Sequence, residues 1–218
     1  MTVDLRVYAL LDPAQSGGHS MGELAALIGP ATTLVQLRDK HGSTREMIAR
    51  AKEIKVALPT HVPLLINDRV DVALAAEADG VHIGWDDMEA AEARLLLGKQ
   101  AIIGLSLKSV KQAQAAPIEH LDYVAIGGVF ITMSKDNPDP PVGLDGFKTI
   151  LDAVRERAPQ MPVCAIAGID ANNAGGVIAA GADGVSVISA LSLAADPAQA
   201  ARALRSVVDV SLSQRRTQ

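Results

Sequence analysis

The sequence predicts a closed (β/α)8 barrel from the alternation of its segments, the make-up of its core and its length. Short β-branched runs alternate with alanine-rich helical runs along all 218 residues, and eight such alternations favour a barrel over an open doubly wound sheet. Hydrophobic residues make up 49% of the chain but aromatic residues only 2%. The core must therefore consist of Val, Ile, Leu and Ala, as in strands that helices bury on both faces. We expect one domain, residues 1–218, of the TIM-barrel type.

The predicted strands are short apolar runs, and a helical pattern follows each of them. The expected strands are Arg6–Leu11, Thr33–Leu37, Pro63–Ile66, Gly80–Ile83, Ala101–Leu105, Tyr123–Ile126, Pro162–Ile166 and Gly184–Ile188. The expected helices lie near Gly22–Ile28, Thr44–Ala57, Val70–Ala76, Met88–Leu97, Val110–Ala115, Leu144–Arg157, Asn172–Ala180 and Pro197–Leu212. The related phrases Ala78–Ile83 and Ala182–Val187 each join a helix to a strand, which indicates a repeating architecture. Polar residues 211–218 are expected to be a fraying helix end.

Charge and cysteine content narrow the class of protein. The chain carries 20 basic and 25 acidic residues, a net charge of −5. This balance argues against nucleic acid or an anionic membrane as partner, so any phosphate recognition must be local. Cys164, the single cysteine, lies in an apolar run and is interpreted as a buried small residue. With no signal-peptide pattern and no long apolar run, we expect a soluble, cytoplasmic protein.

Polar and cationic residues follow the second predicted strand. Strand side chains alternate between faces, so Gln36, Arg38 and Lys40 share one side while Asp39 takes the other. A guanidinium beside an ammonium suits phosphate oxygens. The pattern predicts an anion-binding site, and the alternative is a solvated strand end at which Asp39 pairs with a neighbouring cation.

Carboxylates follow the third and fourth predicted strands. The active site of a barrel lies where its strands end, and Asp68 and the pair Asp86 and Asp87 occupy such positions. Mg²⁺ prefers oxygen ligands and commonly takes one or two carboxylates. Asp68 with one of the other two therefore predicts a magnesium site. The alternative is that each aspartate caps the helix that follows it.

The later strand ends add hydroxyl groups and a long loop. Ser106 ends the fifth strand, and residues 131–142 form a Pro-rich polar segment that begins with Thr132, Ser134 and Lys135. Loops of this length over a barrel are often mobile lids, the alternative being a surface loop. Gly168, Ile188 and Ser189 follow the last two strands, where barrels often bind phosphate. His82 is the histidine within a strand, and we expect it to pack beside the site rather than to bind ligand.

Six phrases, taken together, resemble the thiamine-phosphate synthase family. In chain order they are Gln36–Lys40, Leu65–Arg69, Gly80–Gly84, Ile103–Ser106, Val129–Lys135 and Val187–Ala190. The resemblance runs in order through all of the predicted βα units. It implies an Mg²⁺-dependent transferase of thiamine biosynthesis, which couples hydroxymethylpyrimidine diphosphate to thiazole phosphate, releases pyrophosphate and gives thiamine phosphate.

The same resemblance implies a role for each site residue. The pyrimidine diphosphate would be bound by Gln36, Arg38, Lys40, Asn67, Ser106 and Lys135, of which Arg38, Lys135 and Ser106 would be catalytic. The metal would be bound by Asp68 and by Asp87, since the family's aspartate stands three residues after the glycine that matches Gly84. The thiazole phosphate would be bound by Thr132, Ser134, Gly168, Ile188 and Ser189.

Three residues depart from the family pattern, and two other functions stay open. Trp85 stands where glutamine is usual, Gly128 where proline is usual, and Ala167 replaces the first glycine of a usual pair. A related thiazole tautomerase would need no diphosphate site, so the retained cations and aspartates argue against it. Trp85 is the main support for a non-catalytic barrel that binds phosphometabolites. The expected partners are the two small substrates and, as one option, a second copy in a homodimer.

Overall fold

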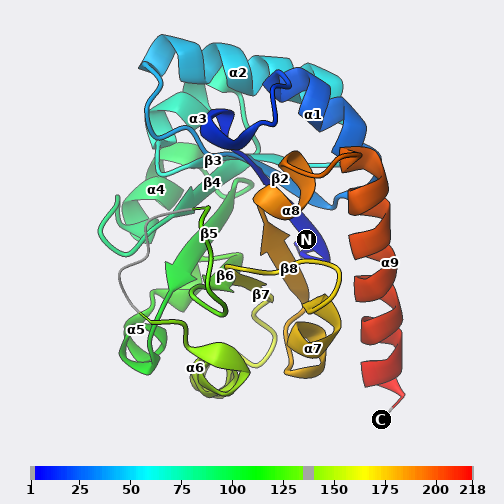
Figure 1. Cartoon of the computed structure of the whole chain (residues 1–218). Coiled ribbons are helices and arrows are strands. Elements are labelled where there is room, and N and C mark those ends of the chain that lie inside the picture. The colour runs from blue at the N-terminus through cyan, green and yellow to red at the C-terminus, as the bar shows by residue number, and fades with distance from the viewer. Residues whose placement is uncertain (1–2, 135–139, 218) are drawn as a thin grey trace.

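In the computed structural model, which describes residues 3–134 and 140–217, parallel strands β1 to β8 form a closed barrel. Figure 1 shows helices surrounding this barrel, with α9 along one side. The strands are β1 (Val7–Leu11), β2 (Leu34–Leu37), β3 (Leu64–Asn67), β4 (Gly80–Ile83), β5 (Ile102–Leu107), β6 (Tyr123–Ile126), β7 (Val163–Ile166) and β8 (Gly184–Val187). The predicted fold class is therefore confirmed.

The helices fall where the sequence predicted them, with small shifts at their ends. They are α1 (Met21–Ile28), α2 (Thr44–Ala57), α3 (Val70–Ala76), α4 (Ala90–Leu97), α5 (Val110–Ala115), α6 (Gly143–Arg157), α7 (Ala174–Ala179), α8 (Ser189–Ser192) and α9 (Pro197–Arg216), with short 3-10 turns η1 (Pro13–Gln15), η2 (Gly29–Ala31) and η3 (Ile118–His120). The short helix α8 was not predicted. The boundary of the last helix was wrong, since α9 continues past Leu212 to Arg216.

Ion pairs and hydrogen bonds explain why α9 remains helical in its polar last turns. Arg215 donates to the carbonyls of Ile178 (3.1 Å) and Ala182 (2.6 Å) and pairs with Asp183. Its guanidinium thus ties the end of α9 to the turn between α7 and β8. In the part of the chain that the structure describes, neither this helix nor any other has the length and apolarity needed to cross a membrane.

Two apolar layers make up the core. The larger lies between strands and helices and is almost free of aromatic residues, Phe147 being the buried exception. The smaller fills the barrel itself and contains Tyr8 and Tyr123, the two tyrosines of the chain, together with Cys164. Burial raises the pKa of the Cys164 thiol, which keeps it protonated. Cys164 is therefore a buried packing residue, as the sequence indicated.

Carboxylates close the end of the barrel where the strands begin. Asp79, Asp122 and Asp183 precede β4, β6 and β8, and each accepts an N–H near the start of the strand before its own: Leu64 of β3 (2.8 Å), Ile103 of β5 (2.8 Å) and Val163 of β7 (2.9 Å). Ion pairs reinforce two of the three, Arg94 with Asp122 and Arg155 with Asp183. The repeated Ala-Asp-Gly-Val phrases are thus structural junctions between strands.

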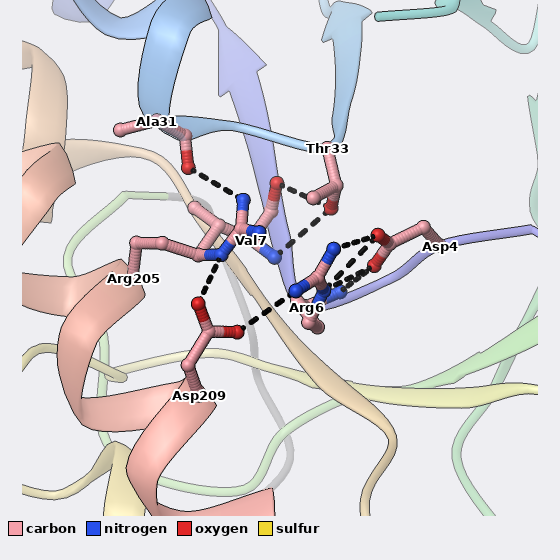
Figure 2. Close-up of polar contacts among 7 residues, drawn as sticks. All are labelled: Asp4, Arg6, Val7, Ala31, Thr33, Arg205 and Asp209. Carbon is pink, nitrogen blue, oxygen red and sulfur yellow. Dashed lines mark hydrogen bonds and ion pairs between the residues drawn. The ribbon is translucent and has the colours of Figure 1, made fainter.

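The first strand is anchored in a similar way, as Figure 2 shows. The Arg6 guanidinium bridges Asp4 and Asp209 of α9, and Arg205 donates to Asp209 (2.7 Å). The Thr33 hydroxyl accepts from the Val7 N–H (3.1 Å). These contacts join the starts of β1 and β2 to the outer helix α9.

Candidate active site

Polar side chains from β1, β2 and β3 meet at the C-terminal end of the barrel. Gln36 points into the barrel and is 1% exposed. Arg38 pairs with Asp12, and Lys40 pairs with Asp68. Asp39 lies on the opposite side, where it pairs with Arg50 of α2. The structure thus separates the residues after β2 into two faces as the alternation predicted, and the two cations face carboxylates of neighbouring strands.

Asp39 serves the fold rather than the site. Burial acts to raise the pKa of its carboxyl, but the N–H groups of Gly42 and His41 and the guanidinium of Arg50 lower the pKa overall. The carboxylate therefore fixes the turn that leads into α2. The alternative interpretation of this strand end holds for Asp39, while Arg38 and Lys40 lie at the open end of the barrel.

Asp68 and Asp87 lie close to each other in the loops after β3 and β4. Burial raises the pKa of Asp68, the Asp87 carboxylate raises it further, and Lys40 opposes both effects. Neither residue caps a helix, because the N-caps of α3 and α4 are Arg69 and Glu89. Asp87 accepts the Gly84 N–H (2.7 Å), which orients its carboxylate. The capping alternative is therefore wrong for Asp68 and Asp87.

The backbone of Asp68 is also unusual. Its φ is +62°, in the left-handed region that costs an ordinary side chain about 1–2 kcal/mol, although Asp and Asn visit it more readily. Its N–H donates to the His82 carbonyl (2.8 Å), which ties this conformation to β4. Strain of this kind is common at functional sites, where the surrounding structure holds it in place.

A cavity of about 360 Å³ lies at the ends of β6, β7 and β8. All five residues expected to bind the second phosphate line it, namely Thr132, Ser134, Gly168, Ile188 and Ser189. The hydroxyls of Ser134 and Ser189 are 2.9 Å apart. Gly168 has a φ of +65°, and a Cβ there would lie 2.4 Å from the Ile131 carbonyl oxygen, so only glycine fits beside this loop. The cavity therefore combines hydroxyl donors with a close backbone approach.

A continuous line of hydrogen bonds crosses the floor of the site inside the barrel. The Gln36 amide nitrogen donates to the Tyr8 hydroxyl, which lies 2.9 Å from the Tyr123 hydroxyl. The His82 ring joins Tyr123 (Nδ1, 2.8 Å) to the Ser106 hydroxyl (Nε2, 2.8 Å). His82 is 7% exposed. These five residues are called here the core chain. All of them except Tyr123 line a cavity of about 50 Å³, together with Asn67 and Arg38.

The three departures from the family pattern have different structural consequences. Gly128 adopts a φ of +77°, which the ring of proline forbids. Ala167 adopts a φ of +96°, a conformation that glycine would tolerate better. Trp85 is 41% exposed and lines a separate hollow, together with Asp87, Met88 and Pro117. Within the described residues it lines neither of the two cavities at the strand ends.

Several residues of the site were missed in the sequence. Asp12, 4% exposed, holds Arg38 in place and also accepts the Ala14 N–H (2.9 Å). Gln15 donates to the Ser134 carbonyl (2.5 Å) and joins the first loop to the sixth. Their position directly after β1 was the available signal. Lys135 and residues 136–139 of the expected lid lie outside the described residues.

Comparison with known proteins identifies related sequences. Residues 7–191 match the family model described as thiamine monophosphate synthase. A thiamine-phosphate synthase of Agrobacterium fabrum is 54% identical over 217 residues, covering 98% of each chain. One from Chloroflexus aurantiacus is 44% identical over 212 residues, covering 96% of this chain and 95% of its own.

Solved structures agree in fold. A thiamine phosphate pyrophosphorylase of Pyrococcus furiosus superimposes with a TM-score of 0.81 at 33% identity and covers 96% of this chain and 98% of its own. A 3-hexulose-6-phosphate synthase superimposes with a TM-score of 0.66 at 16% identity and covers 93% of this chain and 99% of its own. The similarity to the second structure shows a shared barrel fold and nothing more.

Proposed function

The chain belongs to the thiamine monophosphate synthase family, and we propose that its site couples hydroxymethylpyrimidine diphosphate to thiazole phosphate and releases pyrophosphate. The observation that carries this proposal is the division of one barrel end into two parts. Cations and paired carboxylates lie after β2, β3 and β4, while a hydroxyl-lined cavity lies after β6, β7 and β8. A diphosphate with its metal and a phosphate monoester require these two different environments.

The floor of the site supports binding of the pyrimidine. The Gln36 carbonyl oxygen Oε1 is buried and has no hydrogen-bond partner among the described residues. An acceptor left in this state costs about 1–3 kcal/mol, which a ligand carrying a donor would recover. The exocyclic amine of an aminopyrimidine is such a donor. Gln36, Asn67 and Ser106 would then hold the ring above the barrel core, with Arg38 and Lys40 beside its diphosphate.

The carboxylate pair supports a magnesium site. Burial and the neighbouring Asp87 carboxylate raise the pKa of Asp68. Oxygen ligands of this kind suit Mg²⁺, which keeps its other positions for water and phosphate oxygens, so Asp68 and Asp87 would hold the ion. When bound, Mg²⁺ would supply charge neutralisation for the departing pyrophosphate.

The chain's own residues account for the rest of the chemistry. Arg38, Lys40 and Lys135 would stabilise charge that builds on the leaving pyrophosphate, while the electron-rich aminopyrimidine tolerates a methylene cation. Thr132, Ser134, Gly168, Ile188 and Ser189 would hold the thiazole phosphate so that the ring nitrogen attacks that carbon. No protein nucleophile is needed. The protein positions two phosphorylated partners and excludes water that would trap the cation.

Pyrophosphate release tests the proposal. Purified protein is given both substrates with Mg²⁺ and then with excess chelator. We expect release that requires both substrates and the metal, with thiamine phosphate formed in equal amount. Folded protein that binds thiazole phosphate without releasing pyrophosphate would contradict the proposal and favour the tautomerase or the non-catalytic alternative.

A further inference from the structure

The core chain of Gln36, Tyr8, Tyr123, His82 and Ser106 joins two residues that border the pyrimidine side of the site. Its middle members are buried, since Tyr8 is 1% exposed and Tyr123 is not exposed at all. Gly104 makes room for it, because a Cβ there would lie 2.0 Å from the Tyr123 ring. The His82 and Tyr123 rings are stacked with centroids 5.6 Å apart. The three aromatic rings are therefore fixed by packing.

The direction of hydrogen bonding along the core chain follows from its first member. An amide nitrogen can only donate, so the Tyr8 hydroxyl accepts from Gln36. A buried hydroxyl hydrogen without a partner would cost about 1–3 kcal/mol, so Tyr8 donates to Tyr123. Burial raises the pKa of both tyrosines, so each keeps its hydrogen.

The same reasoning fixes the other half of the core chain. Because Tyr123 accepts from Tyr8, its own hydrogen goes to Nδ1 of His82 (2.8 Å). A neutral imidazole that accepts at Nδ1 carries its hydrogen at Nε2. This Nε2–H donates to the Ser106 hydroxyl (2.8 Å), which leaves the hydroxyl hydrogen of Ser106 for a ligand.

We propose that Tyr8, Tyr123 and His82 are positioning residues, which present an acceptor at Gln36 Oε1 and a donor at Ser106 Oγ to the ring of the substrate. A 4-aminopyrimidine carries a donor amine beside an acceptor ring nitrogen and matches this pair. A 4-oxopyrimidine carries an acceptor beside an N–H donor, so its acceptor would face Gln36 Oε1 and its donor would face the Ser106 hydroxyl hydrogen. The core chain therefore selects the amino over the oxo ring. This inference rests on the proposed function and adds to it the basis of its ring specificity.

The protonation of His82 can be measured without substrate. Long-range ¹H–¹⁵N correlation spectra of the labelled protein distinguish the two neutral tautomers, and the His82→Gln variant assigns the signals among the five histidines. We expect the Nε2–H tautomer. An Nδ1–H tautomer would mean that His82 donates to Tyr123 and accepts from Ser106, and it would overturn the proposal.

Selectivity provides the second readout. Tyr123→Phe and Tyr8→Phe each remove one hydroxyl and leave the rings in place. We expect the ratio of kcat/KM for the amino substrate to that for its 4-oxo analogue to fall by about tenfold or more, because sites that hydrogen-bond a ring discriminate strongly against mismatched analogues. Cys164→Ala removes an atom from the same barrel interior but none from the core chain, and should leave this ratio unchanged.

The outcomes separate the two proposals. If the protein formed no thiamine phosphate, the proposed function would fail, and the tautomer of His82 would still decide the direction of the core chain. If the wild-type protein turned over with an Nδ1–H tautomer, or with unchanged selectivity in both phenylalanine variants, the positioning role alone would be overturned.

Discussion

The two ends of the barrel use the same residue types in opposite ways. Where the strands begin, Asp183 accepts a strand N–H and pairs with two arginines. Where the strands end, Asp68 faces the like charge of Asp87 and adopts a left-handed backbone, and the Gln36 oxygen has no partner among the described residues. Interactions satisfied within the chain stabilise the fold. Polar groups without a full set of partners at the other end can bind a ligand. They lower the stability of the fold, and the satisfied contacts where the strands begin offset this loss.

The largest effect expected at the ligand end is on turnover. Asp68→Asn keeps the shape of the side chain and tolerates the positive φ, but it removes a carboxylate proposed to bind the metal. Loss of about 3 kcal/mol of transition-state stabilisation corresponds to roughly 10²-fold in rate. The change relieves the repulsion from Asp87 but also removes the half-exposed ion pair with Lys40, so the unfolding free energy should change by less than about 1 kcal/mol. Turnover measured over a Mg²⁺ titration checks the effect on catalysis, and urea unfolding checks the effect on stability. Turnover near that of the wild type would contradict the assignment of Asp68 as a metal ligand.

The largest effect expected at the opposite end is on stability. Asp183→Ala leaves the Val163 N–H, on a strand residue with no exposed surface, without its acceptor. We expect a loss of about 2 kcal/mol of unfolding free energy, with kcat unchanged well below the melting temperature. The ion pairs add little, because all three side chains are about one-third exposed.

Asp209→Ala is the matched control for this change. Asp209 pairs with Arg6 and Arg205 near the surface (Figure 2) and accepts no strand N–H in the described contacts. Its loss should cost less than about 1 kcal/mol. Equal losses of unfolding free energy in Asp183→Ala and Asp209→Ala would show that the unpaired Val163 N–H is not the main cause of the destabilisation.

The pH dependence of stability should differ in sign between the two ends in metal-free protein. Asp68 has a raised pKa, so its contribution is present below the unfolded pKa near 3.8 and is lost as pH rises through the folded pKa. For Asp4, burial acts to raise the pKa, but hydrogen bonds from Arg6 lower it overall. Its contribution is therefore present above pH 3.8 and lost as pH falls.

Urea unfolding across this range, with chelator present, checks the two signs. In Asp68→Asn, the unfolding free energy should fall less as pH rises above 3.8. In Asp4→Asn, the unfolding free energy should fall less as pH drops below 3.8. The same change of slope in both variants would contradict the difference between the ends.

The smallest effect expected concerns backbone strain at Ala167. Ala167→Gly should relieve the positive φ, and because glycine loses more entropy on folding, the net gain should be about 0.5–1 kcal/mol. Ala153→Gly, within α6, is the control of opposite sign and should cost about 1 kcal/mol. Thermal unfolding of both variants measures the difference, and destabilisation by Ala167→Gly would show that Ala167 is not strained.

The order and type of the elements could be predicted because local patterns specify them. The alternation of β-branched and alanine-rich runs gave β4 and β6, and α2, α3 and α5, with the bounds that the structure has. α8 was missed because four residues carry no periodicity. The end of α9 was misjudged because Arg215 binds groups that are more than 30 residues away.

Strand ends were a sufficient guide to individual polar residues and to the pairing of Asp68 with Asp86 or Asp87, because the third and fourth strands were expected to be adjacent. They did not show the ion pairs of Arg38 with Asp12 and of Lys40 with Asp68. Asp12 follows the same rule and was overlooked. Tyr8 and Tyr123 gave no signal, because the hydrogen bond that joins them runs across the barrel interior between β1 and β6, which are far apart in sequence.

Turnover of the two aspartate variants, measured side by side at a temperature where both are folded, tests the division between the ends most directly. Pyrophosphate release should proceed at the wild-type rate in Asp183→Ala and about 10²-fold more slowly in Asp68→Asn. Equal loss of turnover in both, or loss only in Asp183→Ala, would contradict the assignment of stability to one end of the barrel and of catalysis to the other.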